Sequence, residues 1–320
     1  MGNKKNRTEE NPITIGIPRG LLYFKYGVMW ESFLYSLGVK YIVSPETDKS
    51  ILTKGINIAV DETCLPSKIY LGHVDWLIGR CDYILVSRLA EFGKSGTVCT
   101  KHQAMYDVVK NTFRDRNFKI LVYELEKDSL DAEVTAFLKM GRELGKKRAQ
   151  VMLAYWNAKQ THKTLHIVSL GEQKKLLASK KIKILVISHM YNANDRFVGE
   201  PIFNIIEQLG AIPIKGNIVD EKTAIRKSEE LSQTLPWIYN KELLGAIAEY
   251  RKDVDGIILM SSFPCGPDSM VNEIIVRRVR DIPILNLVLD GQDALAGMET
   301  RLESFIDIIQ FRKKQEHERN

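Results

Sequence analysis

Residues 13–44, ITIGIPRGLLYFKYGVMWESFLYSLGVKYIVS, decide the fold class. ITIGI (13–17) and KYIVS (40–44) are short and apolar, which is typical of strands. Between them, residues 22–37 carry apolar side chains at helical spacing, and the pattern ends at Gly38. Continuous apolar strands separated by a helix predict parallel pairing in a sheet that is covered on both faces.

The same alternation continues along the chain and is interrupted once. Further strands are expected at INIAV (56–60), YILVS (83–87), KILVYE (119–124), KILVIS (183–188), AIPIK (211–215), GIILMS (256–261) and PILNLVLD (283–290). Residues 128–179 lose the strand signal and keep helix-period apolar positions, so they predict one or two connecting helices. The sequence therefore predicts an α/β fold of two units joined by a helical segment, without a convincing sequence repeat between them.

Composition and charge exclude several classes of protein. The chain has 320 residues, of which 44% are hydrophobic and 27% charged, and these are ordinary globular values. The net charge of +6 gathers at the chain ends and on polar helix faces, and no basic stripe with interleaved aromatic residues predicts a nucleic-acid site. No apolar run is long enough to span a membrane, and the polar N-terminus lacks a secretory signal. A cytoplasmic location with reduced thiols is expected.

The four cysteines are the most informative residues. None forms a C-x-x-C pair, which argues against a zinc knuckle, a thioredoxin motif or the local ferredoxin spacing. Cys64 in DETCLPS, Cys99 in GTVCTKHQ and Cys265 in SSFPCGPDS each follow an expected strand and precede an expected helix. Ligands bind at this edge of open α/β sheets, and helix N-termini lower thiol pKa values. The pattern therefore predicts a shared metal site, and small core residues are the alternative.

Cys81 and the polar residues near the same edge complete the candidates. Cys81 in GRCDYILV enters a strand at the opposite edge and is expected to be a small packed residue. Arg19, His189, Tyr191 and Asp195 follow expected strands and are candidate catalytic residues. The alternatives are a solvated surface arginine and, for the residues after 188, a turn with a helix cap.

Several motifs together resemble one family. They include DETCLPSK, CTKHQAMYD, SHMYNANDRFVGEPIFNIIEQLG, SSFPCGPDSMVNEIIVRR and LDGQDALAGMETRLESFID. The chain resembles the acyl-CoA dehydratase activase-related proteins, which are related to 2-hydroxyacyl-CoA dehydratase subunits and double-cubane cluster proteins. The resemblance implies two Rossmann-like domains with an iron–sulfur cluster between them, held by Cys64, Cys99 and Cys265.

The pattern of strands and helices gives the domain ranges, and the resemblance implies the cofactor and the partners. We expect an N-terminal Rossmann-like domain at 12–127, a helical connector at 128–180, a second Rossmann-like domain at 181–296, and a C-terminal helix with a polar tail at 297–320. Three thiolates leave one iron of a [4Fe–4S] cluster without a protein thiolate, and that position could accept a ligand or a bridge to a second cube in a double-cubane assembly. A separate ATP-dependent activase is expected as the electron donor.

Three functions follow from these residues. The first is a redox enzyme or subunit that reduces a small molecule, for example an acyl-CoA. The second is a non-catalytic electron-transfer or cluster-carrier protein. The third is a cluster-free Rossmann-type binding protein, although no G-x-G-x-x-G follows ITIGI to support a dinucleotide site. A homodimer is expected from base rates alone.

Overall fold

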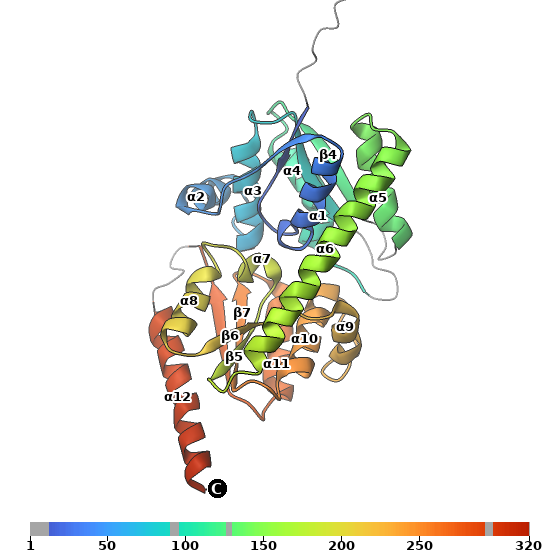
Figure 1. Ribbon diagram of the computed structural model, residues 1–320. Coiled ribbons are helices and arrows are strands. Elements are labelled where there is room, and N and C mark those ends of the chain that lie inside the picture. The colour runs from blue at the N-terminus through green and yellow to red at the C-terminus, as the bar shows by residue number, and fades with distance from the viewer. Residues whose placement is uncertain (1–12, 90–95, 126–129, 292–296, 320) are drawn as a thin grey trace, which may run out of the picture.

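The computed structural model describes residues 13–89, 96–125, 130–291 and 297–319, and it is built around two parallel sheets (Figure 1). The first sheet has the order β2-β1-β3-β4 and the second has the order β6-β5-β7-β8. The strands are β1 (Thr14–Ile17), β2 (Lys40–Val43), β3 (Tyr83–Leu89), β4 (Lys119–Leu125), β5 (Lys183–Ile187), β6 (Ile212–Lys215), β7 (Gly256–Ser262) and β8 (Ile284–Leu289). The predicted α/β class with two Rossmann-like units is confirmed, and both units share one strand order.

Helices cover the faces of each sheet. In the N-terminal lobe, which we define as residues 13–125, these are α1 (Tyr23–Ser36), α2 (Lys49–Ile58), α3 (Leu65–Leu77) and α4 (Thr100–Thr112). In the C-terminal lobe, defined as residues 183–319, they are α7 (Met190–Ala193), α8 (Glu200–Gln208), α9 (Glu221–Ser228), α10 (Ile238–Tyr250), α11 (Gly266–Arg278) and α12 (Met298–Arg319). Every residue of β7 is buried, as expected for a central parallel strand with helices on both faces.

Two helices connect the lobes, as residues 128–179 predict. They are α5 (Leu130–Glu143) and α6 (Arg148–Leu177). The helix α6 has 30 residues and runs diagonally along both lobes (Figure 1). Its first half packs on α1 and α5, with Val151, Ala154, Tyr155 and Ala158 buried. No described helix is long and apolar enough to cross a membrane.

One predicted strand is wrong. INIAV (56–60) lies mostly in α2, which begins after Asp48, whose side chain accepts a hydrogen bond from the amide of Ile51 at 2.8 Å. The alternating apolar residues imitate a strand, but α2 is set by this cap and by packing on α3. A Cβ on Gly55 would lie 1.9 Å from the carbonyl oxygen of Lys68, so the two helices touch through their backbones. Cys64 therefore follows a helix and a turn rather than a strand.

Candidate cysteine-lined site

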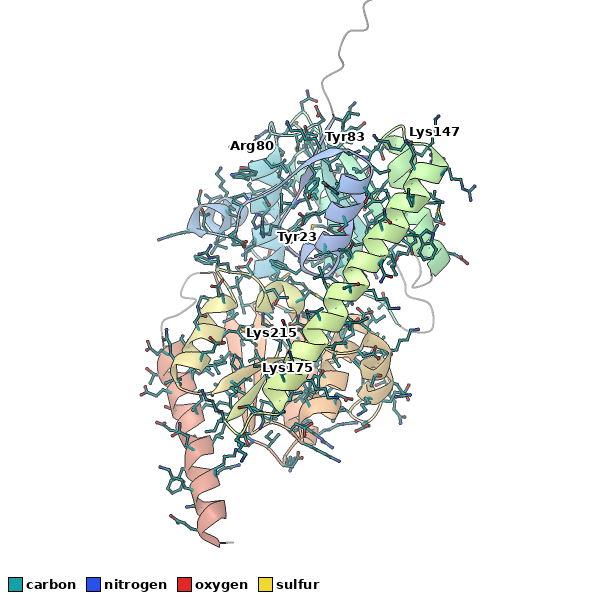
Figure 2. All side chains as sticks on the ribbon, in the orientation of Figure 1. Tyr23, Arg80, Tyr83, Lys147, Lys175 and Lys215 are labelled. Atoms are coloured by element: carbon teal, nitrogen blue, oxygen red, sulfur yellow. The ribbon has the colours of Figure 1, made fainter. Side chains whose placement is uncertain are left out.

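A cavity of about 310 Å³ lies between the lobes and is lined by Cys64, Cys99 and Cys265. The N-terminal lobe also contributes Leu21, Pro66, Ser67, Thr100, Lys101 and His102 to the wall, and the C-terminal lobe contributes Tyr191, Trp237, Pro264, Gly266 and Pro267. Three cysteines that are distant in the sequence therefore face one space. Figure 2 shows the side chains around this boundary between the lobes.

Each of the three cysteines is the N-cap residue of a helix. Cys64 precedes α3, Cys99 precedes α4 and Cys265 precedes α11, and none of them makes a side-chain capping hydrogen bond. Asp48 caps α2 and Asp220 caps α9 with their side chains, whereas the described helices α1, α7, α8 and α10 also begin without a side-chain cap. Cysteine at an N-cap forgoes a bond that is usually worth about 1 kcal/mol. What the three cysteines share is their position at helix starts that border one cavity.

Four helices have N-cap residues that line this cavity. Besides α3, α4 and α11, the helix α10 has Trp237 as its N-cap, and Trp237 lines the cavity. Partial positive charge at helix N-termini stabilises an anion between them. The cavity is thus suited to a negatively charged group.

Burial holds the thiols of Cys99 and Cys265 in their neutral form. Burial raises the pKa of Cys99, although backbone amides such as that of His102 oppose the shift. Burial and the nearby Asp268 carboxylate raise the pKa of Cys265 further. A cation coordinated by sulfur would remove these protons, since metal ligation deprotonates a thiol.

Backbone hydrogen bonds join the lobes on both sides of the cavity. The amide of Leu65 donates to the carbonyl of Phe263 at 3.0 Å. On the Cys99 side, the amide of Thr97 donates to Pro236 and the amide of Ile238 donates to Thr97, both at 2.8 Å. Each bond lies within three residues of a residue that lines the cavity. These hydrogen bonds between the lobes therefore hold the three cysteines in position relative to one another.

A buried polar chain supports Cys265 from behind. Asp268, in the first turn of α11, accepts hydrogen bonds from Asn240 and from Nε2 of His189, each at 2.8 Å. Burial alone would raise the pKa of Asp268, but His189 and Asn240 lower it. The His189 ring stacks on Tyr191 with centroids 5.0 Å apart. Nδ1 of His189 is buried and has no hydrogen-bond partner among the described residues.

The four candidate catalytic residues divide into two groups. Tyr191 lines the cavity, and His189 lies behind it. Arg19 and Asp195 are not part of the cavity wall. Arg19 binds the side chain and carbonyl of Ser44 and pairs with Glu46 at 2.8 Å.

Asp195 belongs to a different buried network, which crosses the lobe boundary. Its Oδ2 accepts a hydrogen bond from Thr47 at 2.5 Å, and its Oδ1 accepts bonds from the amides of Phe197 and Val198. Thr47 and Ser44 each hydrogen-bond one nitrogen of His73, at 3.1 and 3.0 Å. Burial lowers the pKa of His73 to about 3, so this histidine is neutral. Asp195 thus joins the lobes and caps the turn before α8.

Cys81 lies apart from the cavity. It precedes β3, and its Sγ donates to the carbonyl of Leu77 at 3.4 Å. A Cβ on Gly16 would lie 2.5 Å from this Sγ, so Cys81 packs against the sheet. Cys81 therefore serves as the internal comparison for the three cavity cysteines.

Several residues around the cavity could not be predicted from the sequence. Trp237 and Leu21 line it, and Asn240 holds Asp268 from α10. These three residues precede or lie within helices and carry no motif of their own. Their proximity to the cysteines depends on how the lobes pack.

The cavity cysteines do not form a site for one metal ion. Within the described ranges, no three His, Cys, Asp or Glu side chains are placed to hold a single ion. A single zinc requires all donors within about 2.3 Å of one point. An iron–sulfur cube instead binds each thiolate through a different iron, so its ligands stand apart around a central volume. Thiols are the donor type that a cluster would use, and the three cysteines border a common cavity.

Comparison with known families supports the resemblance seen in the motifs. Residues 14–218 match the family described as CoA enzyme activase uncharacterised domain (DUF2229). The chain belongs to this family. The match includes Cys64 and Cys99 and ends before Cys265.

Comparison with individual proteins adds little. No curated protein matches the chain. Among solved structures, the chain is similar to ZnuA with 12% identity and a TM-score of 0.27, over 94% of this chain and 99% of that one. It is also similar to a Mn-bound periplasmic metal-binding protein from candidatus liberibacter asiaticus, with 11% identity and a TM-score of 0.28, over 93% and 99% of the two chains.

Proposed function

We propose that this protein holds an iron–sulfur cluster between its lobes and uses it for low-potential electron transfer to a small molecule. The observation that carries the proposal is the position of Cys64, Cys99 and Cys265 as uncapped N-cap residues around one 310 Å³ cavity. A cluster bound there would supply a one-electron donor with one iron free of protein thiolate. The family description, CoA enzyme activase uncharacterised domain, is consistent with a role beside a CoA-dependent enzyme.

The chain's own residues account for binding. Cys64, Cys99 and Cys265 would hold the cluster, and the amides of the helix N-termini would offset its negative charge. Ser67 places its hydroxyl 3.2 Å from the Sγ of Cys64, where it can donate to a thiolate. Hydrogen bonds of this kind tune the reduction potential of a cluster.

The rest of the wall suits a small molecule beside the cluster. Trp237, Tyr191 and Leu21 provide apolar surface, and Lys101 stands among the lining residues as a cation. An acyl-CoA is the substrate class that we propose, because the thioester end is apolar and the remainder of the molecule is anionic. The electron donor would be a separate ATP-dependent activase. The proposed location is the cytoplasm, where thiols remain reduced.

The test is anaerobic purification followed by iron and sulfide analysis with EPR. The proposal expects a brown protein with iron and labile sulfide in equal amounts, and the iron per chain separates one cube from a double-cubane assembly. A colourless protein after careful anaerobic reconstitution would reject it. Addition of an acyl-CoA distinguishes a reductase from a non-catalytic electron carrier. A substrate bound next to the cluster should change the EPR signal of a reductase, whereas the signal of a carrier should stay unchanged.

A further inference from the structure

Tyr191 places a phenol hydroxyl near all three cavity cysteines. The residue lines the same cavity as Cys64, Cys99 and Cys265. Burial raises the pKa of Tyr191 well above its usual value, and Asp268 and the three thiols add to this shift because they lie near the phenol oxygen. The hydroxyl therefore keeps its proton and can donate it in a hydrogen bond.

The Tyr191 hydroxyl makes no hydrogen bond with any residue in the part of the chain that the structure describes. Other tyrosines of the chain use theirs. Tyr155 donates to Glu133 at 2.8 Å, and Tyr250 donates to the carbonyl of Ile218 at 2.9 Å. A tyrosine hydroxyl that is removed from bulk water usually has a partner. The proton of Tyr191 is thus available to a group inside the cavity.

The ring of Tyr191 is held in place by two buried histidines. The His189 ring stacks on it with centroids 5.0 Å apart and planes 20° apart, and the His102 ring lies 5.7 Å away. His189 is itself fixed, because its Nε2 bonds Asp268 at 2.8 Å and Asn240 holds the same carboxylate from α10. The phenol therefore has a fixed orientation before any group enters the cavity.

The two lobes contribute different donors to the cavity wall. Ser67 and Thr100 bring hydroxyl groups from the N-terminal lobe. Tyr191 is the one residue with a hydroxyl among those that line the cavity from the C-terminal lobe. Two further residues of that wall, Pro264 and Pro267, have no N–H to donate. An anionic group in the cavity would therefore obtain its hydroxyl donor on the C-terminal side from Tyr191.

We propose that Tyr191 donates a hydrogen bond to a sulfur atom of the cluster held by Cys64, Cys99 and Cys265, and that this bond raises the reduction potential of the cluster. The inference rests on the proposed function, because the cluster supplies the acceptor. Reduction adds negative charge to a cluster, so a hydrogen-bond donor stabilises the reduced state more than the oxidised state. The three cysteines remain the ligands, and Tyr191 acts on the cluster without binding iron.

Tyr191→Phe tests this inference, because it removes the hydroxyl and keeps a ring to stack on His189. After anaerobic reconstitution, the variant should bind as much iron as the wild type and should have a more negative midpoint potential in an EPR-monitored redox titration. In D2O, electron–nuclear double resonance of the reduced wild type should show a deuteron coupling that the variant lacks. Tyr250→Phe is the matched control, since its hydroxyl bonds Ile218 outside the cavity, and it should keep the wild-type potential.

The outcomes distinguish this inference from the proposed function. An unchanged potential and an unchanged deuteron coupling in an iron-loaded Tyr191→Phe would overturn the inference and leave the cluster in place. Loss of iron from the variant would also overturn it, since Tyr191 would then be needed to hold the cluster. A wild type without iron would reject the proposed function and the inference together. Circular dichroism checks folding, and Tyr191→Met, which also lacks a hydroxyl, replaces the variant if it fails.

Discussion

The amide of Leu65 donates a hydrogen bond to the carbonyl of Phe263 across the boundary between the lobes, at 3.0 Å. Leu65 directly follows Cys64, and Phe263 lies two residues before Cys265. One backbone bond therefore fixes the separation of two cysteines that belong to different lobes. Together with the hydrogen bonds of Thr97 on the other side of the cavity, this bond holds the two lobes in contact around the three cysteines.

Serine substitution should lower the bound iron at the three cavity cysteines but not at Cys81. We expect Cys64→Ser, Cys99→Ser and Cys265→Ser each to lower the iron bound per chain severely, because a serine hydroxyl is a poor ligand for cluster iron. Cys81→Ser should bind iron like the wild type, since Cys81 packs near Gly16 and Leu77. Iron and sulfide analysis after anaerobic reconstitution is the measurement. Equal iron contents in all four variants would contradict the assignment.

Asp268→Asn should change the reduction potential of a bound cluster and leave its iron content unchanged. Asp268 is 5% exposed, lies in the first turn after Cys265, and carries a negative charge held by His189 and Asn240. Removing that charge favours the reduced cluster, so the midpoint potential should become less negative. An EPR-monitored redox titration measures it, with Ser269→Ala as the control. An unchanged or more negative potential would show that Asp268 does not act on the cluster.

Glu242→Ala should destabilise the fold through Lys25. The Lys25 ammonium lies 2.8 and 3.1 Å from the two oxygens of Glu242, and both side chains are 11% exposed. Losing one partner of a buried pair should cost about 3 kcal/mol, the lower end of the usual range, because Glu221 also contacts Lys25 at 2.9 Å. Urea denaturation measures the loss.

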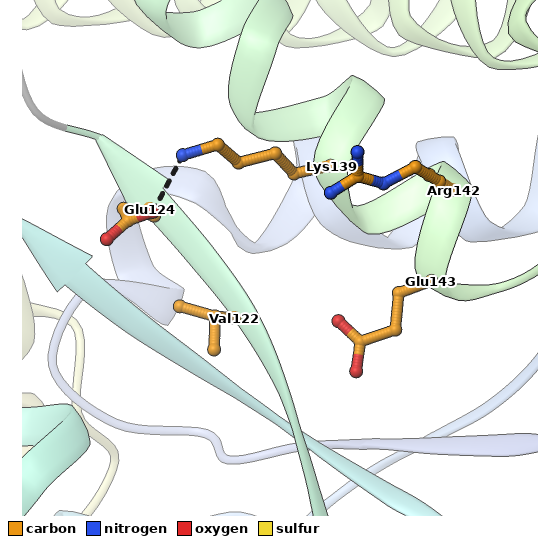
Figure 3. A pocket seen from close by; sticks show the side chains of 5 residues that line it. All are labelled: Val122, Glu124, Lys139, Arg142 and Glu143. Atoms are coloured by element: carbon orange, nitrogen blue, oxygen red, sulfur yellow. Dashed lines mark hydrogen bonds and ion pairs between the residues drawn. The ribbon is translucent and has the colours of Figure 1, made fainter.

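The control for Glu242 is a more exposed ion pair. Glu124 pairs with Lys139 at 2.8 Å beside β4 and α5, next to Val122, Arg142 and Glu143 (Figure 3). Glu124→Ala should lower the free energy of unfolding by less than about 1 kcal/mol, since solvent screens this pair. If Glu242→Ala and Glu124→Ala lowered the free energy of unfolding by similar amounts, the burial of Lys25 would not strengthen its ion pair.

His73 should make the fold less stable in acid. Burial lowers the pKa of His73 to about 3, whereas an unfolded histidine has a pKa of about 6.5. Between these values the unfolded chain takes up a proton that the folded chain refuses. Stability should therefore fall as the pH drops below about 6.5, by up to roughly 1.4 kcal/mol per pH unit from this residue.

The measurement is urea denaturation between pH 4.5 and pH 7.5. His73→Asn should be less stable at neutral pH, because its bonds to Ser44 and Thr47 change, but its stability should depend less steeply on pH. A wild-type slope in His73→Asn would exclude the proposed neutral state of His73.

Local patterns in the sequence were enough for the fold class and for part of the site. Apolar runs such as YILVS and GIILMS, separated by helical patterns, predict parallel strands because strand and helix periods are visible over a few residues. Pro66 and Pro267 mark the first turns of α3 and α11, so the positions of Cys64 and Cys265 before helices could also be predicted. The helix α2 was not predicted, because INIAV alternates like a strand, whereas the Asp48 cap and the packing on α3 decide its conformation.

The sequence by itself determined two α/β units and the place of each cavity cysteine at a helix start, since these depend on neighbours along the chain. Only the tertiary structure decided that Cys64, Cys99 and Cys265 share a cavity and that Arg19 and Asp195 lie outside it. These features depend on how the two lobes pack and hydrogen-bond across their boundary. Such long-range contacts join residues more than a hundred positions apart, so no spacing of apolar residues along the sequence reveals them.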